Sequence, residues 1–431
     1  MIINKYRAGT IYLIEFLERM AFFVFLASFT HLMINENGME QESAYDLYGT
    51  LMFLFYSAPI LGGILIDYKI GYNKSVILGA CSLFVGYAWL AGLPGKALFG
   101  AIVALSVGHG LYKPAIMALF ANTVPISGRD TAFVVFYGVI SLAGGLGGAM
   151  AGQLIASGGQ SLVFAFSAGC LAIATGLALA LLRAARGEAA FRSPQPVASA
   201  APAAPAAPAA PAAPGATVPW ALVLQILLIT ALSQAATLQT QIERSLWSRS
   251  HADLTFGGLW TPELGGALLQ ASDVIFQLLL LPFVILLFNY LRRRSIEPSS
   301  VAKVGMALVL QLLPCLLLFR AAQVGSQGQL AGTGWIVGAT LAAALPSLFL
   351  IPLVLSMISQ LIPRDRQATM FALWFLLVPI FNGINSRILK WSMSGSGEWR
   401  FLPAAAFALV AAGWWIANSR KTEQALARTL T

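Results

Sequence analysis

Charged side chains inside apolar segments are the residues of this sequence that could do chemistry. Residues 10–33 are mostly apolar but contain Glu15, Glu18 and Arg19. Positions i, i+3 and i+4 of a helix share one face, so these side chains are expected to point the same way. Residues 97–121 contain His109 and Lys113, which are also four apart. Carboxylates beside cations in a low dielectric are coupled, and this favours sites that exchange protons.

The same charges could instead form a static salt-bridge network that only fixes helix packing. A charge at the bilayer centre costs about 2.5–3.5 kcal/mol on insertion scales, so such residues are rare and usually line a cavity. We therefore favour a functional role for the cluster of Glu15, Glu18, Arg19 and Lys113. His109 by itself fits a proton relay and a hydrogen-bonded structural histidine equally well.

A further polar site is predicted in residues 265–290. Asp273 lies in an otherwise apolar stretch there, with Gln270 three residues before it and Gln277 four after it. These side chains share one helical face. An aspartate is too costly to leave facing lipid, so we expect Asp273 to face a cavity.

The segments that carry these residues are long enough to cross a membrane. The 431 residues are 58% hydrophobic and 10% charged, whereas soluble domains carry about 25% charged residues, which excludes an ordinary soluble protein. The apolar residues fall in blocks of roughly 20, the length that crosses a bilayer core of about 30 Å. The first block lacks a small-residue cleavage site and is expected to be a retained span. The predicted spans are 10–33, 48–66, 74–93, 97–121, 131–156, 160–182, 219–241, 265–290, 301–319, 334–361, 367–389 and 400–418.

The net charge of +9 is explained by topology. With the N-terminus inside, most Lys and Arg residues fall in inner segments, which is the positive-inside pattern. The first outer loop is acidic, with Glu36, Glu40, Glu42 and Asp46. We therefore expect both termini in the cytoplasm, a lipid bilayer as surroundings and no nucleic-acid partner.

An Ala/Pro-rich stretch divides the chain into two halves. Proline recurs every third residue through 200–214, which blocks helix and favours an extended rod. We predict a lobe over 1–183, a cytoplasmic linker over 184–218 and a second lobe over 219–431. Pro114 and Pro125 recur as Pro352 and Pro363 with the same spacing, each pair followed by Arg-Asp. The predicted fold class is an all-α membrane protein of twelve helices in two six-helix lobes, the build of major facilitator transporters.

Other motifs give little support to an enzyme. The sequence has no phosphate-binding G-x-x-x-x-G-K-[ST] loop, no H-E-x-x-H and no nucleophile elbow. Its three cysteines lie inside apolar blocks, so neither a disulfide framework nor a metal site is indicated. No cofactor is predicted. Gly144, Gly148 and Gly152 form a stripe of small residues that predicts close helix packing.

Several motifs of the first half resemble the proton-dependent oligopeptide transporters, a branch of the major facilitator superfamily. Residues 15–19 read E-F-L-E-R, like the family's E-x-x-E-R motif. The resemblance continues through P-I-L-G-G-I-L-I-D-Y-K-I-G at 59–71, G-H-G-L-Y-K-P at 108–114 and R-D-T-A-F-V-V-F-Y at 129–137. It is weaker in the second half, at 233–238, 270–282 and 372–376. It covers essentially the whole chain apart from the linker.

The resemblance implies a site for proton coupling and for a substrate carboxylate. In that family the carboxylates and arginine of span 1 act with the lysine of span 4. The matching residues here are Glu15, Glu18, Arg19 and Lys113. We expect Lys113 to lie across the central cavity from span 1. Trp374 matches a tryptophan that helps to line the family's pocket.

The substrate side departs from the family's pattern. Ser233, before Gln234, stands where the family has a glutamate, and Ser347 where it has the glutamate that holds a peptide's amino terminus. Losing such a contact costs about 1.5–3 kcal/mol, which puts ordinary peptide transport in doubt. Asp273 is expected to replace the missing carboxylate. The full set expected to bind substrate is Arg19, Phe22, Phe23, His109, Lys113, Ser141, Gln234, Asp273, Ser347 and Trp374.

These observations favour a proton-coupled symporter of a small peptide-like solute, working by alternating access in a bacterial inner membrane. One alternative is a proton-linked carrier or exporter of another zwitterionic or anionic metabolite. A second is a transporter-like protein that does not transport and serves as a sensor or subunit.

Overall fold

The chain is built from long helices, as the apolar blocks predict. The computed structural model describes residues 2–92, 98–185, 219–255, 258, 261–326, 330–394 and 401–430. Nearly all of the predicted linker, residues 186–218, lies outside the described part. The helices of the first half are α1 (Ile2–Asn35), α2 (Gln41–Leu65), the π-helix η1 (Ile66–Ile70), α3 (Tyr72–Gly92), α4 (Leu98–Thr123), the 3₁₀-helix η2 (Ile126–Gly128) and α5 (Arg129–Ala184). Those of the second half are α6 (Trp220–His251), α7 (Pro262–Arg293), α8 (Ser300–Leu310), α9 (Leu312–Ser326), α10 (Thr333–Leu361), the 3₁₀-helix η5 (Arg364–Arg366), α11 (Gln367–Ser394) and α12 (Leu402–Leu430).

The predicted all-α fold class is confirmed. Within the described residues, nine helical segments are long and apolar enough to cross a membrane. Two predicted spans merge in α5, which breaks at Gly158 and Gly159, where φ of Gly159 is 58°. Glycine reaches that left-handed conformation without a steric penalty. The predicted span 301–319 is interrupted at Gln311, between α8 and α9.

The described residues form two compact units. The first unit comprises Met1–Arg129, Val139–Val218 and Ile362–Leu376. The second comprises Asp130–Gly138, Pro219–Leu361 and Leu377–Thr431. The start of α5 therefore belongs with the second unit, and the start of α11 with the first. These assignments depart from lobes divided only at the linker.

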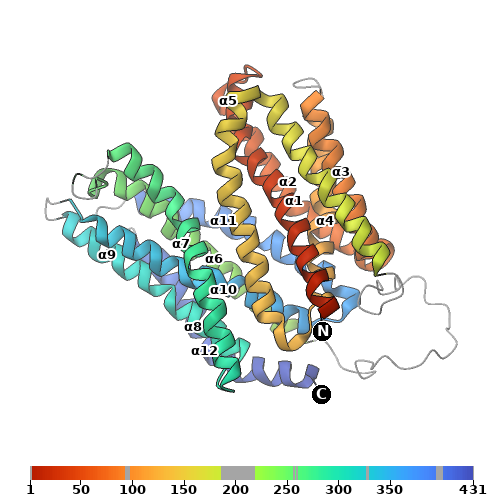
Figure 1. Ribbon diagram of the computed structural model, residues 1–431. Helices are drawn as coiled ribbons and strands as arrows, with labels where there is room; N and C mark the ends of the chain where they lie inside the picture. The colour runs from red at the N-terminus through yellow and green to blue at the C-terminus, as the bar shows by residue number, and fades with distance from the viewer. Residues whose placement is uncertain are drawn as a thin grey trace. The chain divides into compact units, whose positions relative to one another are not determined.

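Helix α4 is the centre of the first unit, where it lies against α2 and α3 (Figure 1). Glycines make this close packing possible. A Cβ atom on Gly62 would lie 1.9 Å from the carbonyl oxygen of Gly110. A Cβ atom on Gly79 would lie 2.6 Å from the backbone nitrogen of Tyr112. Small residues allow helix backbones to approach in this way, and α4 is consequently buried along most of its length.

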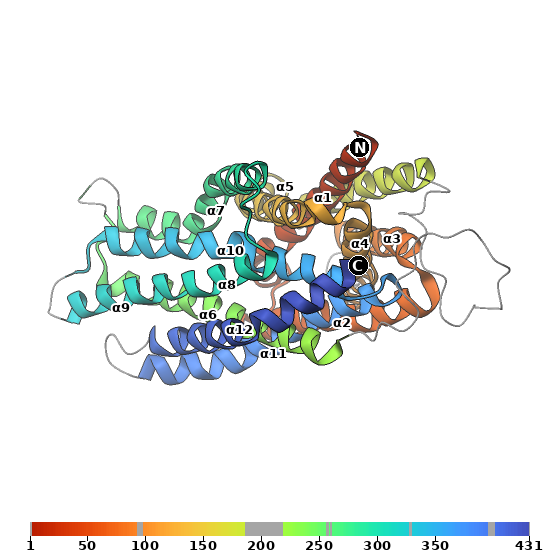
Figure 2. The same cartoon turned by 90° about the horizontal axis from the view of Figure 1, so that it is seen from below.

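Helix α10 has the corresponding position in the second unit. It packs against α6, α7, α8 and α9, and Figure 2 shows it running alongside α8. Its prolines Pro346 and Pro352 are both buried. The buried Pro114 of α4 and Pro352 of α10 thus lie in the central helices of their own units. This agrees with the predicted internal repeat.

Candidate functional site

The charged side chains of α1 and α4 form one buried cluster in the first unit. Arg19 donates to Glu18 from Nε at 2.6 Å and from Nη2 at 2.5 Å. Lys113 donates to Glu15 from its ammonium group. Arg19 Nε also lies 3.9 Å from Glu15 Oε1. Two carboxylates and two cations therefore neutralise one another away from water.

Burial makes this neutrality necessary. Glu15 is 0% exposed and Glu18 is 1% exposed. Arg19 and Lys113 are also buried, at 8% and 7%. An unpaired charge in such a place would cost several kcal/mol. A proton can therefore enter or leave the cluster only if the charges of the remaining groups are rebalanced.

Aromatic rings cover the arginine side of the cluster. The guanidinium carbon of Arg19 lies 4.4 Å from the centre of the Phe22 ring. The ring of Phe22 meets that of His109 edge-on at 5.0 Å, and Phe55 lies 4.5 Å from the same histidine. His109 Nδ1 is 3.9 Å from Glu18 Oε1. His109 is thus next to the carboxylates, where it could pass a proton or only pack.

The cluster retains unused hydrogen-bonding capacity. Within the described part of the chain, Glu15 Oε2, His109 Nε2 and the Tyr112 hydroxyl are buried and make no hydrogen bond. Buried polar atoms normally have a partner, so such groups call for an explanation. A proton, a water molecule or a polar group of a solute would satisfy them.

The structure brings together some of the predicted residues and separates others by unit. Glu15, Glu18, Arg19, Phe22, His109 and Lys113 form the cluster. Lys113 bonds directly to Glu15, so the expectation that a cavity separates Lys113 from span 1 is wrong for this structure. Phe23, Ser141 and Trp374 also belong to the first unit, whereas Gln234, Asp273 and Ser347 belong to the second.

Phe23 packs against a neighbouring helix, and Trp374 is buried. Phe23 lies against Gly144 and Gly147 of α5. Trp374, in α11, is only 3% exposed. Ser141 of α5 is partly buried. Their expected roles in substrate binding stay predictions.

Asp273 has a partner that the sequence reasoning missed. Arg244 donates to Asp273 Oδ1 at 3.1 Å and to Oδ2 at 2.5 Å. Arg244 also donates to Thr340 Oγ1 at 2.8 Å. Arg244 thus balances the charge of Asp273, and the expectation that Asp273 replaces the missing substrate-side carboxylate stays a prediction. The side chain of Gln270 is outside the described part.

The hydropathy pattern predicts a span that ends at residue 241, so it places Arg244 outside the membrane-spanning segment. Helix α6 continues to His251 and carries Arg244 into the interior, where it is 1% exposed. The available signal was Asp273 itself. An aspartate inside an apolar span needs a partner, and the end of the neighbouring span carries an arginine.

The two serines at the family's glutamate positions satisfy their hydroxyls locally. Ser233 donates to Gln311 Oε1 at 2.5 Å, and Gln311 Nε2 donates to Thr237 at 2.7 Å. Gln311 is the residue at which α8 and α9 separate. Ser347 donates to the Ala343 carbonyl at 2.8 Å. Neither serine can replace the charge of a carboxylate.

Polar networks fix the helix ends in each unit. In the first, Asp67 accepts hydrogen bonds from the backbone nitrogen atoms of Ala368 and Thr369 at 3.3 and 2.7 Å. A carboxylate there complements the partial positive charge at the start of α11. Asn122 also donates to Gln367 at 2.9 Å. These bonds hold the start of α11 in the first unit.

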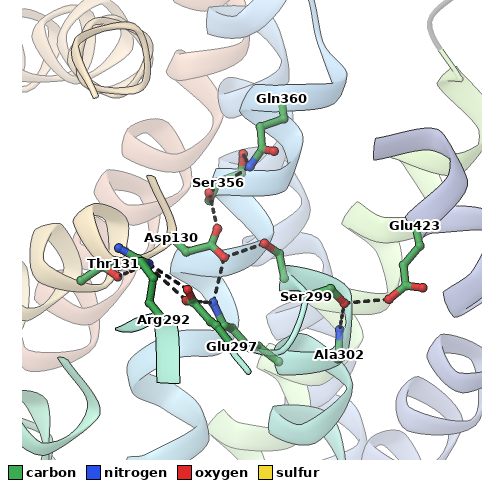
Figure 3. Close-up of polar contacts among 11 residues, drawn as sticks. Asp130, Thr131, Arg292, Glu297, Ser299, Ala302, Ser356, Gln360 and Glu423 are labelled. Carbon is green, nitrogen blue, oxygen red and sulfur yellow. Dashed lines mark hydrogen bonds and ion pairs between the residues drawn. The ribbon is translucent and has the colours of Figure 1, made fainter. Parts of the chain in front are cut away.

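In the second unit, Asp130 holds the start of α5 (Figure 3). It accepts hydrogen bonds from Ser300 at 2.5 Å, Ser356 at 2.7 Å and Lys303 at 3.2 Å. Lys303 also donates to Glu297 at 2.6 Å. Arg292, at the end of α7, donates to Thr131 and to Glu297 (Figure 3). We call this set the Asp130 network.

No group of three metal-binding side chains is found among the residues that the structure describes. All three cysteines are free.

Comparisons with known proteins agree with this architecture. Residues 11–295 match the family model described as Major Facilitator Superfamily. Dipeptide and tripeptide permease B of Photorhabdus asymbiotica is 29% identical over 136 residues, which are 31% of this chain and 28% of that relative. The uncharacterized transporter YclF of Bacillus subtilis is 23% identical over 88% of this chain and 86% of its own.

Solved structures show the same fold. A peptide transporter POT in complex with sulfate has a TM-score of 0.62 at 19% identity, covering 97% of this chain and 95% of that chain. A POT family transporter in complex with 5-aminolevulinic acid has a TM-score of 0.64 at 17% identity, with 96% of each chain covered.

Proposed function

Because this chain belongs to the Major Facilitator Superfamily and fits a divergent member of its proton-dependent oligopeptide transporter branch, we propose that it carries a small peptide-like solute across the membrane together with protons. The observation that carries the proposal is the buried, neutral cluster of Glu15, Glu18, Arg19 and Lys113. A membrane-embedded cluster that must stay neutral couples a proton to the charge of a bound solute.

The chemistry assigns a role to each member of the cluster. Glu15 and Glu18 are the exchangeable acids. Arg19 and Lys113 are the cations that are released when those acids take up protons, and both can then bind an anionic group. The solute and the protons would be carried by alternating access between the two sides of the bilayer.

A second candidate is a proton-linked carrier or exporter of a different small zwitterionic or anionic metabolite. The observation that favours it is the replacement of two substrate-side carboxylates by Ser233 and Ser347, whose hydroxyls are used within their own unit. The relative bound to 5-aminolevulinic acid supports a substrate range wider than peptides.

Transport in liposomes tests the proposal. Purified protein is reconstituted, and uptake of labelled dialanine and of labelled 5-aminolevulinic acid is measured with and without an inward proton gradient. We expect gradient-driven accumulation of at least one of them. Glu18→Gln should abolish accumulation but leave exchange of labelled for unlabelled solute, since the amide keeps the shape of the side chain and the exchangeable acid is lost.

Glu42→Gln, a change at an exposed glutamate of the first loop, is the matched control and should transport normally. Accumulation that survives in both Glu15→Gln and Glu18→Gln would overturn the proton assignment. Binding of either solute without gradient-driven flux would favour the sensor alternative.

A further inference from the structure

A groove with a volume of about 570 Å³ lies between α8 and α12 of the second unit. Its α8 wall is apolar and includes Ala302, Met306 and Val309, and its α12 wall includes Trp415 and Ile416. Met306, Val309 and Ile416 are all exposed. The groove is therefore open to the surroundings of the two helices.

Gly305 and Trp415 form the floor of the groove. The indole Nε1 of Trp415 donates to the Val301 carbonyl oxygen at 2.9 Å, and the side chain is buried. A Cβ atom on Gly305 would lie 3.2 Å from the Trp415 ring, so glycine lets the ring lie close against α8. A hydrogen-bonded ring thus fixes the position of the floor.

One end of the groove is polar. Glu423 lines it and accepts a hydrogen bond from Ser299 at 2.7 Å. Ser299 in turn accepts from the backbone nitrogen of Ala302 at 3.1 Å, as the N-cap of α8 (Figure 3). Arg420 lies four residues after Ile416 and three before Glu423, so it is on the same side of α12. Arg420 and Glu423 are both exposed, which gives this end a cation and an anion.

The polar end coincides with the predicted boundary of the membrane. Ser299 precedes the predicted span 301–319, and Glu423 follows the predicted span 400–418. The α8 wall, residues 302–310, rises about 12 Å at 1.5 Å per residue. Half of a bilayer core of about 30 Å is about 15 Å. The apolar part of the groove therefore matches the length of an acyl chain within one leaflet.

The charges at the polar end select a headgroup. A phosphate group fits Arg420, because guanidinium groups bind phosphate oxygens through paired hydrogen bonds. Glu423 repels a headgroup that is only negative but pairs with a primary ammonium, which can also donate hydrogen bonds. Lys303, the basic residue of α8, is buried and already bonded to Asp130 and Glu297. A headgroup with one phosphate and one primary ammonium fits both exposed charges.

We propose that the groove between α8 and α12 binds one phosphatidylethanolamine molecule. An acyl chain lies along the apolar walls, the phosphate binds Arg420 and the ammonium binds Glu423. The bound lipid adds to the bond between Ser299 and Glu423 in holding the end of α12 against α8. The site is independent of the proposed transport, because none of its residues belongs to the charged cluster of α1 and α4.

A second copy of the chain is the other occupant that an apolar groove could take. The observations favour a lipid because the polar groups lie at one end only, at the level predicted for headgroups. Lipids also combine an apolar chain with a charged headgroup in the same order as the groove does.

The experiment measures lipid retention by native mass spectrometry of the purified, delipidated full-length protein. Dioleoyl phosphatidylethanolamine, phosphatidylcholine and phosphatidylglycerol are added separately at equal concentrations. Ala302→Leu fills the groove, and Arg420→Gln removes the cation. Glu423→Gln removes the anion but keeps an oxygen that can accept from Ser299, so the contact between the helices is kept.

Two control variants change α12 outside the groove. Ala417→Leu enlarges an exposed alanine whose side chain does not line the groove. Lys421→Gln removes the cation next to Arg420 on the helix, about 100° around its axis. Both controls should retain lipid as wild type does.

We expect wild type to retain one phosphatidylethanolamine in preference to the other two lipids, and Ala302→Leu to lose this retention. Arg420→Gln should weaken retention about fivefold, as the loss of one basic residue at a membrane surface predicts. Glu423→Gln should lose the preference for phosphatidylethanolamine over phosphatidylglycerol.

Three results would overturn the lipid site. The first is equal retention of the three lipids by wild type, or unchanged retention in Ala302→Leu. The second is a lower thermal-unfolding midpoint in Arg420→Gln and Glu423→Gln with an unchanged lipid preference, which would make the two charges purely structural. The third is a wild-type dimer that Ala302→Leu dissociates, which would assign the groove to a second copy. None of these measurements depends on transport, so a failure of the proposed function is detected separately.

Discussion

At the scale of single residues, helical spacing predicts which charges share a face but not which of them pair. Glu15, Glu18 and Arg19 were correctly placed together, because their separations of three and four fit one face. The pair that forms between Glu18 and Arg19 joins adjacent residues, whose long side chains fold towards each other. The bond from Lys113 to Glu15 joins residues 98 apart. Only the packing of α4 on α1 can decide it.

The first prediction concerns Lys113, which the family resemblance places across the central cavity from span 1. Its partner Glu15 is 0% exposed, so water cannot replace the ammonium group. Lys113→Met should destabilise the protein by about 3–5 kcal/mol, because it leaves a buried carboxylate without its cation. The thermal-unfolding midpoint in detergent measures the effect.

The control is Glu15→Gln/Lys113→Met, which removes both charges. It should recover most of the lost stability while remaining inactive in gradient-driven transport, since a coupling acid is gone. A single variant as stable as wild type would show that Lys113 is solvated and that the buried pair is not formed.

At the scale of helices, small-residue stripes predict close packing only where a partner backbone is present. Gly144 of the predicted stripe contacts Phe23, but a Cβ atom on Gly148 or Gly152 would have no described atom within 4 Å. Among the glycines that the structure describes, the tightest position is instead Gly62 of α2, which lies against Gly110 of α4. The sequence pattern of α5 resembles such an interface, yet it carries no information about which helix lies opposite.

Helix ends were the least predictable elements because polar residues there are satisfied by tertiary contacts. The end of α6 at His251 and the interruption at Gln311 both follow from polar side chains that find buried partners, Arg244 with Asp273 and Gln311 with Ser233. A prediction from hydropathy alone ends a span where polar residues begin, so it cannot locate helix ends that depend on buried polar partners.

The second prediction concerns the Asp130 network, through Glu297 in the loop between α7 and α8. Burial by itself raises the pKa of Glu297. The hydrogen bonds and positive charges of Arg292 and Lys303 together lower it by more than burial raises it, so the pKa of Glu297 lies below its usual value. A carboxylate with a lowered folded-state pKa stabilises the protein above its unfolded pKa of about 4.3, and this stabilisation is lost as pH falls through the folded-state pKa.

Glu297→Gln should therefore lower the thermal-unfolding midpoint at pH 7, and the difference from wild type should shrink as the pH is lowered below about 4. Glu42→Gln changes an exposed glutamate, so its thermal-unfolding midpoint should differ little from that of wild type, and by the same amount at pH 7 as below about pH 4. A Glu297→Gln difference that does not change with pH would mean that the charge of Glu297 contributes nothing to the network.

At the scale of the whole molecule, the sequence predicts two halves, and the structure assigns two short segments differently. The start of α5 belongs with the second unit because Asp130 bonds to Ser300, Lys303 and Ser356. The start of α11 belongs with the first unit because its backbone bonds to Asp67. Composition marks the linker at 184–218, but the specific bonds that assign these segments depend on tertiary structure.

The last prediction is the orientation of the chain in the bilayer, with both termini and the linker in the cytoplasm. The excess of Lys and Arg in alternate segments predicts it. Contacts within each unit agree with the predicted sides: Arg292 meets Thr131, Asp67 meets Thr369, and Glu36 accepts a bond from the Gln160 backbone, so inner segments meet inner and outer meet outer.

Cysteine labelling measures this orientation. Single cysteines are introduced after all three native cysteines are changed to alanine, and intact cells are treated with a membrane-impermeant maleimide. Glu40→Cys should be labelled in intact cells, whereas Ala198→Cys and Lys421→Cys should be labelled only after permeabilisation. Labelling in the reverse order would show that the positive charges of this chain lie outside, and the assignment of inner and outer ends would then be inverted for every helix.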